Sequence, residues 1–420
     1  MQCGQSKIAS VQTKDMVMLI KKMNFLTIAF LTLFSLNLFA GEWSNVVGVN
    51  FSSGEAKYPN LEIDSNGNLY ALYKDMESSK KATVMRYSGT SWSAVGGKGF
   101  SAGKVNYTDL EIDSSGNLYA LYQDVSNGYK ATLMKYSGSS WSSVGDKGFT
   151  SGYAYELKLK IASDGTIYAL YQDNDNDLKA TVMKYDGSSW SVVGSAGFSG
   201  GKATYLDLAL NSANVPYVIY KDFANSYKAT VMKYNGTSWE AVGGVGFSSS
   251  DAYYTNLEID SSGNLYAFYR DKAKSYKATV MKYDGSSWEV VGSKGFSDGK
   301  IQATDLEIDS SGNIYASYKD MSNSKKATVM KYSGTSWEVV GSKAFSAGTA
   351  YGIDLEIAND GSLYVLYKDV ANSGGATLMK YTDYDQTATP QTQTDMPKLC
   401  GALSFPTNSF GVDAPLSGCN

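Results

Sequence analysis

The chain has 420 residues, of which 43% are hydrophobic, so it is long enough to bury a substantial core. Its 37 Lys and Arg nearly balance its 41 Asp and Glu, and a slightly acidic surface argues against nucleic acid or an anionic membrane as the main partner. Histidine is absent, which excludes every mechanism built on an imidazole base and every zinc site that needs a histidine ligand.

Residues 1–40 have the features of an export signal with an upstream extension. Lys21 and Lys22 precede an apolar run over 25–39, and a small residue, Ala40, follows the run. A bilayer span needs about 20 apolar residues, and this run is shorter. The sequence therefore predicts a protein that is secreted, periplasmic or on the cell surface, with no membrane contact after cleavage of the signal.

Residues 41–385 repeat one unit of 49 residues seven times without a slip. Every tryptophan of the protein falls at the same position of the unit: Trp43, Trp92, Trp141, Trp190, Trp239, Trp288 and Trp337. Fixed self-similarity at this length is typical of a repeat architecture, in which one domain absorbs most of the chain. Near-identical units also favour a monomer that holds several equivalent surfaces.

Each unit contains four short runs rich in Val, Ile, Tyr and Thr, and turn residues separate them. In the sixth tryptophan's unit the runs are 288–292, 305–309, 314–318 and 326–332. Such runs predict β-strands, and the third is apolar on both of its alternating faces, so it lies between two sheets. The sequence therefore predicts an all-β fold: a seven-bladed β-propeller of four-stranded antiparallel blades.

The two ends of the repeat region complement each other. Residues 43–48 supply a tryptophan strand with no preceding partner, whereas the seventh unit ends at Tyr381 with no tryptophan after it. We therefore expect the N-terminal strand to pair in the last blade and to close the ring. The face that carries the blade-to-blade connections has the longer loops, and we expect ligands there.

Residues 386–420 differ in composition from the repeats. The segment 386–397 is rich in Thr, Gln and Pro, which is typical of a linker, and a short tail follows. If Cys3 is removed with the signal, Cys400 and Cys419 remain as an even pair. An oxidising compartment would allow these two cysteines to form a disulfide.

An aspartate closes the third run of every unit and gives seven candidate ligand-binding carboxylates on one rim. The alternative role is local, because a lysine follows six residues later in six of the units and can bridge its own loop. The sequence favours this loop-bridging role. The seven aspartates are Asp75, Asp124, Asp173, Asp222, Asp271, Asp320 and Asp369.

A glutamate recurs in the second run of five units, at Glu62, Glu111, Glu258, Glu307 and Glu356. We expect these side chains to line the central channel or to pair with a basic residue such as Lys135. In the third and fourth units the position becomes Lys160 and Ala209. These units are therefore where a unique ligand-binding site could have arisen, with Lys160 as a candidate, and sequence drift explains the change as well.

Two further features each have two interpretations. The sequence Asp173, Asp175, Asp177 resembles the opening of a calcium loop, although Leu178 and Lys184 replace the expected glycine and glutamate, so a solvated acidic loop is favoured over a calcium site. The tryptophans can stack on sugar rings or fill the space between blades, and the second role is favoured because Trp is strongly buried on average. No other cofactor is predicted.

Two repeat signatures resemble known families. The Asp-x-x-Gly-Asn-x-Tyr pattern in 112–119 and its copies resembles bacterial β-propeller repeats, including the NHL-like repeats. The Trp-x-x-Val-Gly pattern in 283–292 is similar to the tectonin and tachylectin-type lectin propellers. The resemblance implies a scaffold that binds sugars or proteins.

Our leading hypothesis is an exported, non-catalytic protein that recognises an extracellular glycan or protein through several equivalent sites, because multivalent binding gains avidity from copies. One alternative is a secreted hydrolase or lyase that uses Asp and Glu in the channel, and it predicts acidic side chains from units three and four in one pocket. The other alternative is a protein-interaction scaffold.

Overall fold

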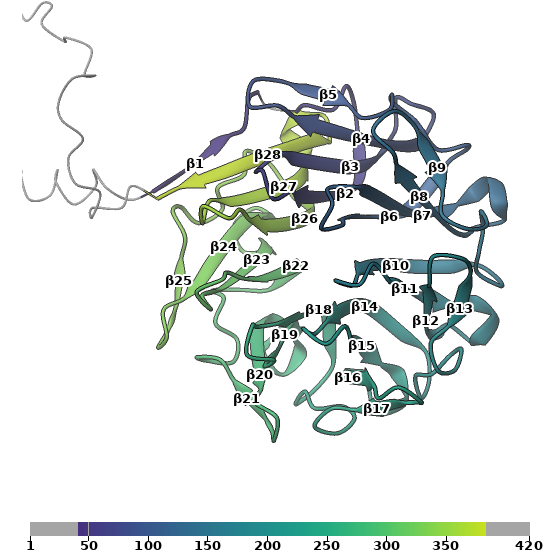
Figure 1. Ribbon diagram of the computed structural model, residues 1–420. Helices are drawn as coiled ribbons and strands as arrows, with labels where there is room; N and C mark the ends of the chain where they lie inside the picture. Colours follow the sequence, from purple (N-terminus) through teal and green to yellow (C-terminus); the bar gives the residue numbers. More distant parts are fainter. Residues whose placement is uncertain (1–40, 49, 384–420) are drawn as a thin grey trace, which may run out of the picture. The chain divides into compact units, whose positions relative to one another are not determined.

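The computed structural model describes residues 41–48 and 50–383, and within them it contains seven four-stranded antiparallel sheets arranged around a centre (Figure 1). The predicted seven-bladed propeller is confirmed. The expected export signal, the linker, the tail and the Cys400–Cys419 pair lie outside the described residues. The innermost strands are β2 (Ala56–Ile63), β6 (Val105–Ile112), β10 (Ala154–Ile161), β14 (Ala203–Leu210), β18 (Ala252–Ile259), β22 (Ile301–Ile308) and β26 (Ala350–Ile357).

Each blade continues outward from its inner strand in chain order, so that blade one is β2–β5 and blade six is β22–β25. The second strands are β3 (Leu69–Asp75), β7 (Leu118–Asp124), β11 (Ile167–Asp173), β15 (Pro216–Asp222), β19 (Leu265–Asp271), β23 (Ile314–Asp320) and β27 (Leu363–Asp369). The third strands are β4 (Lys81–Tyr87), β8 (Lys130–Tyr136), β12 (Lys179–Tyr185), β16 (Lys228–Tyr234), β20 (Lys277–Tyr283), β24 (Lys326–Tyr332) and β28 (Gly375–Thr382). The outer strands are β5 (Trp92–Ala94), β9 (Trp141–Ser143), β13 (Trp190–Val192), β17 (Trp239–Ala241), β21 (Trp288–Val290), β25 (Trp337–Val339) and β1 (Glu42–Asn45).

Single 3-10 turns follow the second strand in five blades: η1 (Val125–Asn127), η2 (Asn174–Asn176), η3 (Phe223–Asn225), η4 (Lys272–Lys274) and η5 (Val370–Asn372). Among the residues that the structure describes, no helix has the length and apolar character needed to cross a membrane.

The N-terminal strand closes the ring, as predicted. β1 is the outer strand of blade seven, and it pairs with β28 in a register that places Trp43 opposite Tyr381. The indole Nε1 of Trp43 donates to the carbonyl oxygen of Val340 in blade six at 2.9 Å. Blade seven therefore combines one strand from the start of the repeat region with three strands from its end.

The hairpins between first and second strands form because their sequence supplies a local cap. In blade two the Asp113 carboxylate accepts hydrogen bonds from the backbone N–H of Ser115 at 3.0 Å and of Asn117 at 2.8 Å. Gly116 has a φ of 80°, which a residue with a side chain adopts only at a cost. The Asp-Ser-Ser-Gly-Asn pattern is thus a turn signal.

The hydrophobic core lies between blades. Leu72 and Val84 of blade one pack against Leu110 and Tyr122 of blade two, and all four side chains are buried. The same arrangement recurs around the ring, which explains why the second strands are apolar on both faces.

The loops divide between two faces of the propeller. The blade-to-blade connections and the loops after the second strands share one face, which we call the connection face. The hairpins after the first and third strands share the other, which we call the hairpin face. Antiparallel order within each blade dictates this division.

Candidate functional sites

The seven aspartates that close the second strands are buried, with at most 1% of each residue exposed. Their hydrogen bonds are local. The Asp173 carboxylate accepts from the backbone N–H of Asp175 at 3.1 Å, from the side-chain amide of Asn176 at 2.9 Å and from the hydroxyl of Thr181 at 2.8 Å. Each aspartate therefore organises its own loop and does not line a shared surface.

The expected ion pairs with the lysines six residues later do not form within the described ranges, where the ion pairs involve other residues. Instead, the aspartate carboxylate accepts a hydrogen bond from the hydroxyl of a threonine in the third strand. Thr83 donates to Asp75 at 3.0 Å and accepts from the backbone N–H of Gly99 at 2.8 Å, which links the loop to the blade connection. The loops are thus bridged by hydrogen bonds from neutral donors to the carboxylate, instead of surface charge pairs.

The structure does not bring Asp173, Asp175 and Asp177 together as a ligand set. Asp173 faces its own loop and is buried, whereas Asp175 and Asp177 are exposed. Across the described part of the chain, no group of three or more Asp, Glu or Cys side chains has an arrangement suited to a metal ion.

The tryptophans fill the space between blades. Trp337 stacks on Phe296 of blade five, with ring centroids 4.2 Å apart, and its Nε1 donates to the carbonyl oxygen of Val291 at 2.9 Å. Six tryptophans make the equivalent hydrogen bond to the preceding blade, while the buried Nε1 of Trp92 has no partner. A sugar could not stack on the indole face that the phenylalanine already covers.

The recurrent glutamates lie in the central channel. A layer of aspartates also lies there, two residues earlier in the inner strands and therefore nearer the connection face, and the sequence alone did not indicate it. Four of these aspartates accept a backbone N–H from the inner strand of the next blade, for example Asp109 from Leu159 at 2.6 Å and Asp305 from Leu355 at 2.7 Å. They therefore tie adjacent blades together. The four are Asp109, Asp207, Asp305 and Asp354.

Burial raises the pKa of many channel carboxyl groups, and the facing carboxylates add to the effect. The pKa of Asp109 rises to about 7, and that of Glu258 to about 8. Burial and the neighbouring acids also hold the pKa values of Glu62, Glu307 and Glu356 well above the ordinary glutamate value. The channel therefore retains protons near neutral pH.

Blade three supplies the counter-charge. Lys160 lies 2.5 Å from Glu111, and Lys158 lies 3.3 Å from Asp207. Burial alone would lower the pKa of Lys160, but the carboxylates of Glu111 and Glu62 raise it above the ordinary lysine value. The divergence of the third unit thus places two ammonium groups in an acidic channel, which Glu156 of blade three and Asp207 of blade four also line.

The widest part of the channel is its mouth on the connection face, a cavity of about 380 Å³. One residue from the β-bulge of each inner strand surrounds it, and each has a φ between 45° and 57°. These seven residues are Tyr58, Tyr107, Glu156, Tyr205, Tyr254, Ala303 and Gly352. The sequence carries no distinct signal for them, because the flanking positions vary between units as well: Lys57, Asn106 and Tyr155 precede this position, and Pro59, Thr108 and Leu157 follow it.

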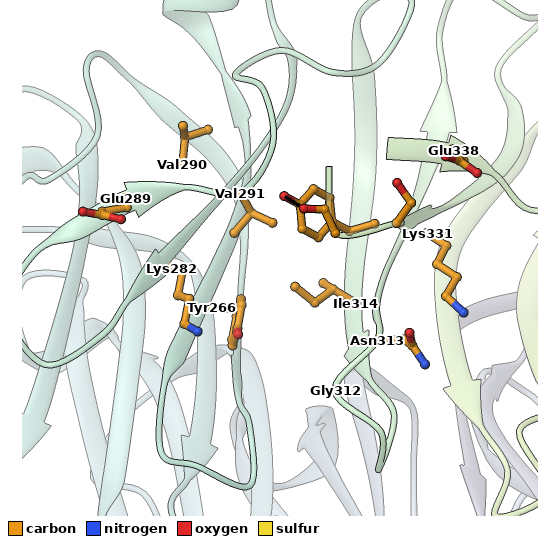
Figure 2. A pocket seen from close by; sticks show the side chains of 13 residues that line it. Tyr266, Lys282, Glu289, Val290, Val291, Gly312, Asn313, Ile314, Lys331 and Glu338 are labelled. Carbon is orange, nitrogen blue, oxygen red and sulfur yellow. Dashed lines mark hydrogen bonds between the residues drawn. The ribbon is translucent and has the colours of Figure 1, made fainter. Parts of the chain in front are cut away.

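Grooves between neighbouring blades open on the hairpin face. The groove between blades five and six has a volume of about 700 Å³, and Figure 2 shows Tyr266 and Lys282 on one wall with Ile314, Asn313 and Lys331 on the other. A second groove of about 300 Å³ lies between blades six and seven. Lys331 and Glu338 line both grooves.

The groove wall combines apolar and charged groups from a single row of paired residues. In blade five, Tyr266 pairs with Lys282, and Lys282 pairs with Glu289 on the outer strand. The Lys282 ammonium lies 5.3 Å from the Tyr266 ring centroid, in cation–π range. A glutamate occupies this outer position in blades four to six and a serine in the others: Glu240, Glu289 and Glu338 against Ser44, Ser93, Ser142 and Ser191.

The comparisons with known proteins concern the fold. Neither protein-family models nor curated proteins give a match to this chain. A polysaccharide lyase, the PL25 ulvan lyase bound to -[GlcA(1-4)Rha3S]-, is similar in structure with a TM-score of 0.53 at 12% identity, covering 79% of this chain and 94% of the lyase.

Two further solved structures resemble the chain more loosely. The Aleuria aurantia lectin AAL, a mutant in complex with Fucalpha1-6GlcNAc, has a TM-score of 0.46 at 13% identity, covering 69% of this chain and 99% of the lectin. The Penicillium chrysogenum alpha-L-arabinanase complexed with arabinobiose has a TM-score of 0.45 at 13% identity, covering 83% and 99%. The likeness to the lyase, at 12% identity, shows the fold alone.

Proposed function

We propose that this chain is a non-catalytic, multivalent glycan-binding protein whose binding sites are the grooves between blades on the hairpin face. The observation that carries the proposal is the groove between blades five and six. Its volume of about 700 Å³ lies within the range of ligand pockets in general, about 300 to 1,000 Å³.

The chemistry of the groove suits a sugar. A pyranose ring has an apolar face of C–H groups and an edge of hydroxyl groups, so it needs an apolar surface beside donors and acceptors. Val291, Ile314 and Tyr332 provide the apolar surface. The Lys331 ammonium donates to hydroxyl oxygens, and the Glu338 carboxylate accepts from hydroxyl groups.

Repetition of the groove supports multivalency. Lys331 and Glu338 contact two neighbouring grooves, so the sites follow each other around the ring. Weak sites that bind one polymer gain avidity from their number, because each later contact is intramolecular. The ulvan lyase of the same fold was solved with a sugar bound, and this makes polysaccharides a sensible first ligand class for a test.

The experiment is a glycan array with the full-length chain, followed by calorimetry on the ligands that bind. Glu338→Gln keeps the size of the side chain and removes the charge in both grooves, and we expect affinity to fall about tenfold, the effect of one charge-assisted hydrogen bond. Glu77→Gln on the connection face is the matched control, because Glu77 is also exposed.

Three outcomes would contradict the proposal. An array without binding, combined with capture of one defined protein partner, would favour the interaction scaffold. Release of new sugar ends from a polysaccharide would favour the hydrolase or lyase. An equal loss of affinity in Glu77→Gln and Glu338→Gln would place the glycan elsewhere on the molecule.

A further inference from the structure

The mouth of the channel differs from the grooves because it occurs once and breaks the sevenfold symmetry. Two tyrosine pairs line it: Tyr58 and Tyr107 have ring centroids 5.4 Å apart, and Tyr205 and Tyr254 have centroids 4.8 Å apart. Glu156 of blade three lies between the pairs in the order of the blades. At the same position blades six and seven have Ala303 and Gly352, so the tyrosines do not continue around that side of the mouth.

The tyrosines are held in a backbone conformation that favours glycine. Their φ values lie between 45° and 55°, where a residue with a Cβ costs about 1 kcal/mol more than glycine. Threonines of the following blade hold the bulges: the hydroxyl of Thr108 donates to the carbonyl oxygen of Tyr58 at 2.6 Å, and the hydroxyl of Thr304 to that of Tyr254 at 2.5 Å. The aromatic groups are thus positioned in advance of any ligand.

The channel below the mouth has an excess of acidic groups. Counting Glu156, four aspartates and five glutamates, ten carboxyl groups share the channel with two ammonium groups. Lys158 is engaged by Asp207 and Lys160 by Glu111, so neither is available to an anionic ligand. Many of these acids hold protons near neutral pH, and a bound cation would lower their pKa values and release those protons, so the channel can supply the charge that compensates a cation.

We propose that the channel mouth binds a linear aliphatic polyamine, with one ammonium group among the tyrosines and the rest of the chain extending toward the carboxyl layers. Tyrosine faces attract an ammonium group through the ring quadrupole, and the Glu156 carboxylate can accept its hydrogen bonds.

The dimensions of the channel fit a chain better than a compact cation. Below the mouth the free volume narrows to about 70 Å³. Lys158 and Lys160 stand at alternate positions of β10, in the regular part of the strand, so the aspartate and glutamate layers are about 7 Å apart. Ammonium groups separated by four methylenes are about 6 Å apart at ordinary bond lengths, so they match the layers.

The test is calorimetry of the full-length chain with spermidine and 1,4-diaminobutane, and 1,4-butanediol as the uncharged control. We expect one saturable site per chain for the amines and none for the diol. Tyr107→Ala and Glu156→Gln should each weaken binding at least fivefold. Alanine already occupies the equivalent position at Ala303 with a φ of 47°, so Tyr107→Ala is expected to fold.

Glu338→Gln separates this proposal from the glycan grooves, because it should leave spermidine binding unchanged. Heats of binding that do not saturate would overturn the proposal. An unchanged spermidine affinity when Tyr107→Ala and Glu156→Gln are combined would do so too. Tighter binding of a tri-lysine peptide than of spermidine would also overturn it, in favour of a peptide ligand.

Discussion

Raising the pH from 6 to 9 should destabilise the propeller, because the folded channel holds protons that the unfolded chain does not. The pKa of Asp109 is raised from 3.8 to about 7, and that of Glu258 from 4.5 to about 8. The folded state therefore binds more protons than the unfolded state above about pH 4, so the free energy of unfolding falls as pH rises through the folded pKa values. Stability from these groups is fully present at low pH and is lost toward pH 9.

The magnitude follows from the two pKa values. Between pH 6 and pH 9, proton linkage removes about 1.4 kcal/mol at Asp109 and about 2.6 kcal/mol at Glu258. The effective dielectric constant of a protein site is well above that of a dry interior, so we halve the sum to about 2 kcal/mol. Lys158 and Lys160 do not oppose the trend, because their raised pKa values keep both charged throughout this window.

Urea unfolding at pH 6 and pH 9 is the assay, since urea adds no ions that would screen the channel. With a slope of about 3 kcal/mol/M, the midpoint should fall by about 0.5 to 1 M. In Glu258→Gln the urea midpoint should fall by less than half of that amount between pH 6 and pH 9. At pH 9 the variant should be more stable than the wild type. Glu289→Gln, an exposed change in the same blade, should keep the wild-type shift. A midpoint that does not change with pH would refute the reasoning.

Three further changes test the packing. Trp337→Phe leaves a carbonyl without its donor and should cost about 1 kcal/mol more in urea unfolding than Trp92→Phe, because the Nε1 of Trp92 has no partner; equal costs would contradict this. Asp173→Ala removes three hydrogen bonds and should lower stability by about 2 to 3 kcal/mol, whereas a cost near zero would speak against the buried loop role. Deleting residues 42–45 removes β1 and should make the chain sensitive to limited proteolysis, with resistance at wild-type level as the contrary result.

The blades, their number and the closure of the ring could be predicted because each follows from spacing along the chain. The period of 49 residues fixes the repeat, and the unpaired tryptophan strand at Trp43 requires a partner near Tyr381. Packing between blades explains both the seven tryptophans and the second strands that are apolar on both faces. These features depend on patterns that hold within one unit or between neighbouring units.

The role of the seven aspartates was harder to predict, because an acidic residue at the end of a strand suggests an exposed rim. The sequence does contain the signals of burial: Asn127 follows Asp124 by three residues and Thr132 follows it by eight, and both donate to its carboxylate. Only the three-dimensional loop brings these donors together around one side chain.

The channel mouth could not be predicted from alternation, because a β-bulge interrupts the inner strands. In β2 the register shifts between Lys57 and Asn60, so Tyr58 points in a direction that strict alternation would not assign to it. The groove carboxylates were missed for a different reason. The position of Glu289 on the outer strand is exposed and holds glutamate in three units and serine in the other four. Such variation looks like ordinary surface drift.

The channel also explains why the seven units cannot be identical. Seven copies of the commonest unit would place seven glutamates and seven aspartates in one channel, and mutual repulsion would oppose folding. The lysines of blade three and the asparagines at Asn60 and Asn256 relieve that repulsion, so their divergence has an electrostatic reason without any ligand. The four tyrosines at the mouth have no such electrostatic reason, because tyrosine is uncharged. Their backbone is strained, and Ala303 and Gly352 show that smaller residues fit at the same position. Electrostatics therefore does not explain why tyrosines stand at the mouth, and a ligand is the explanation that remains.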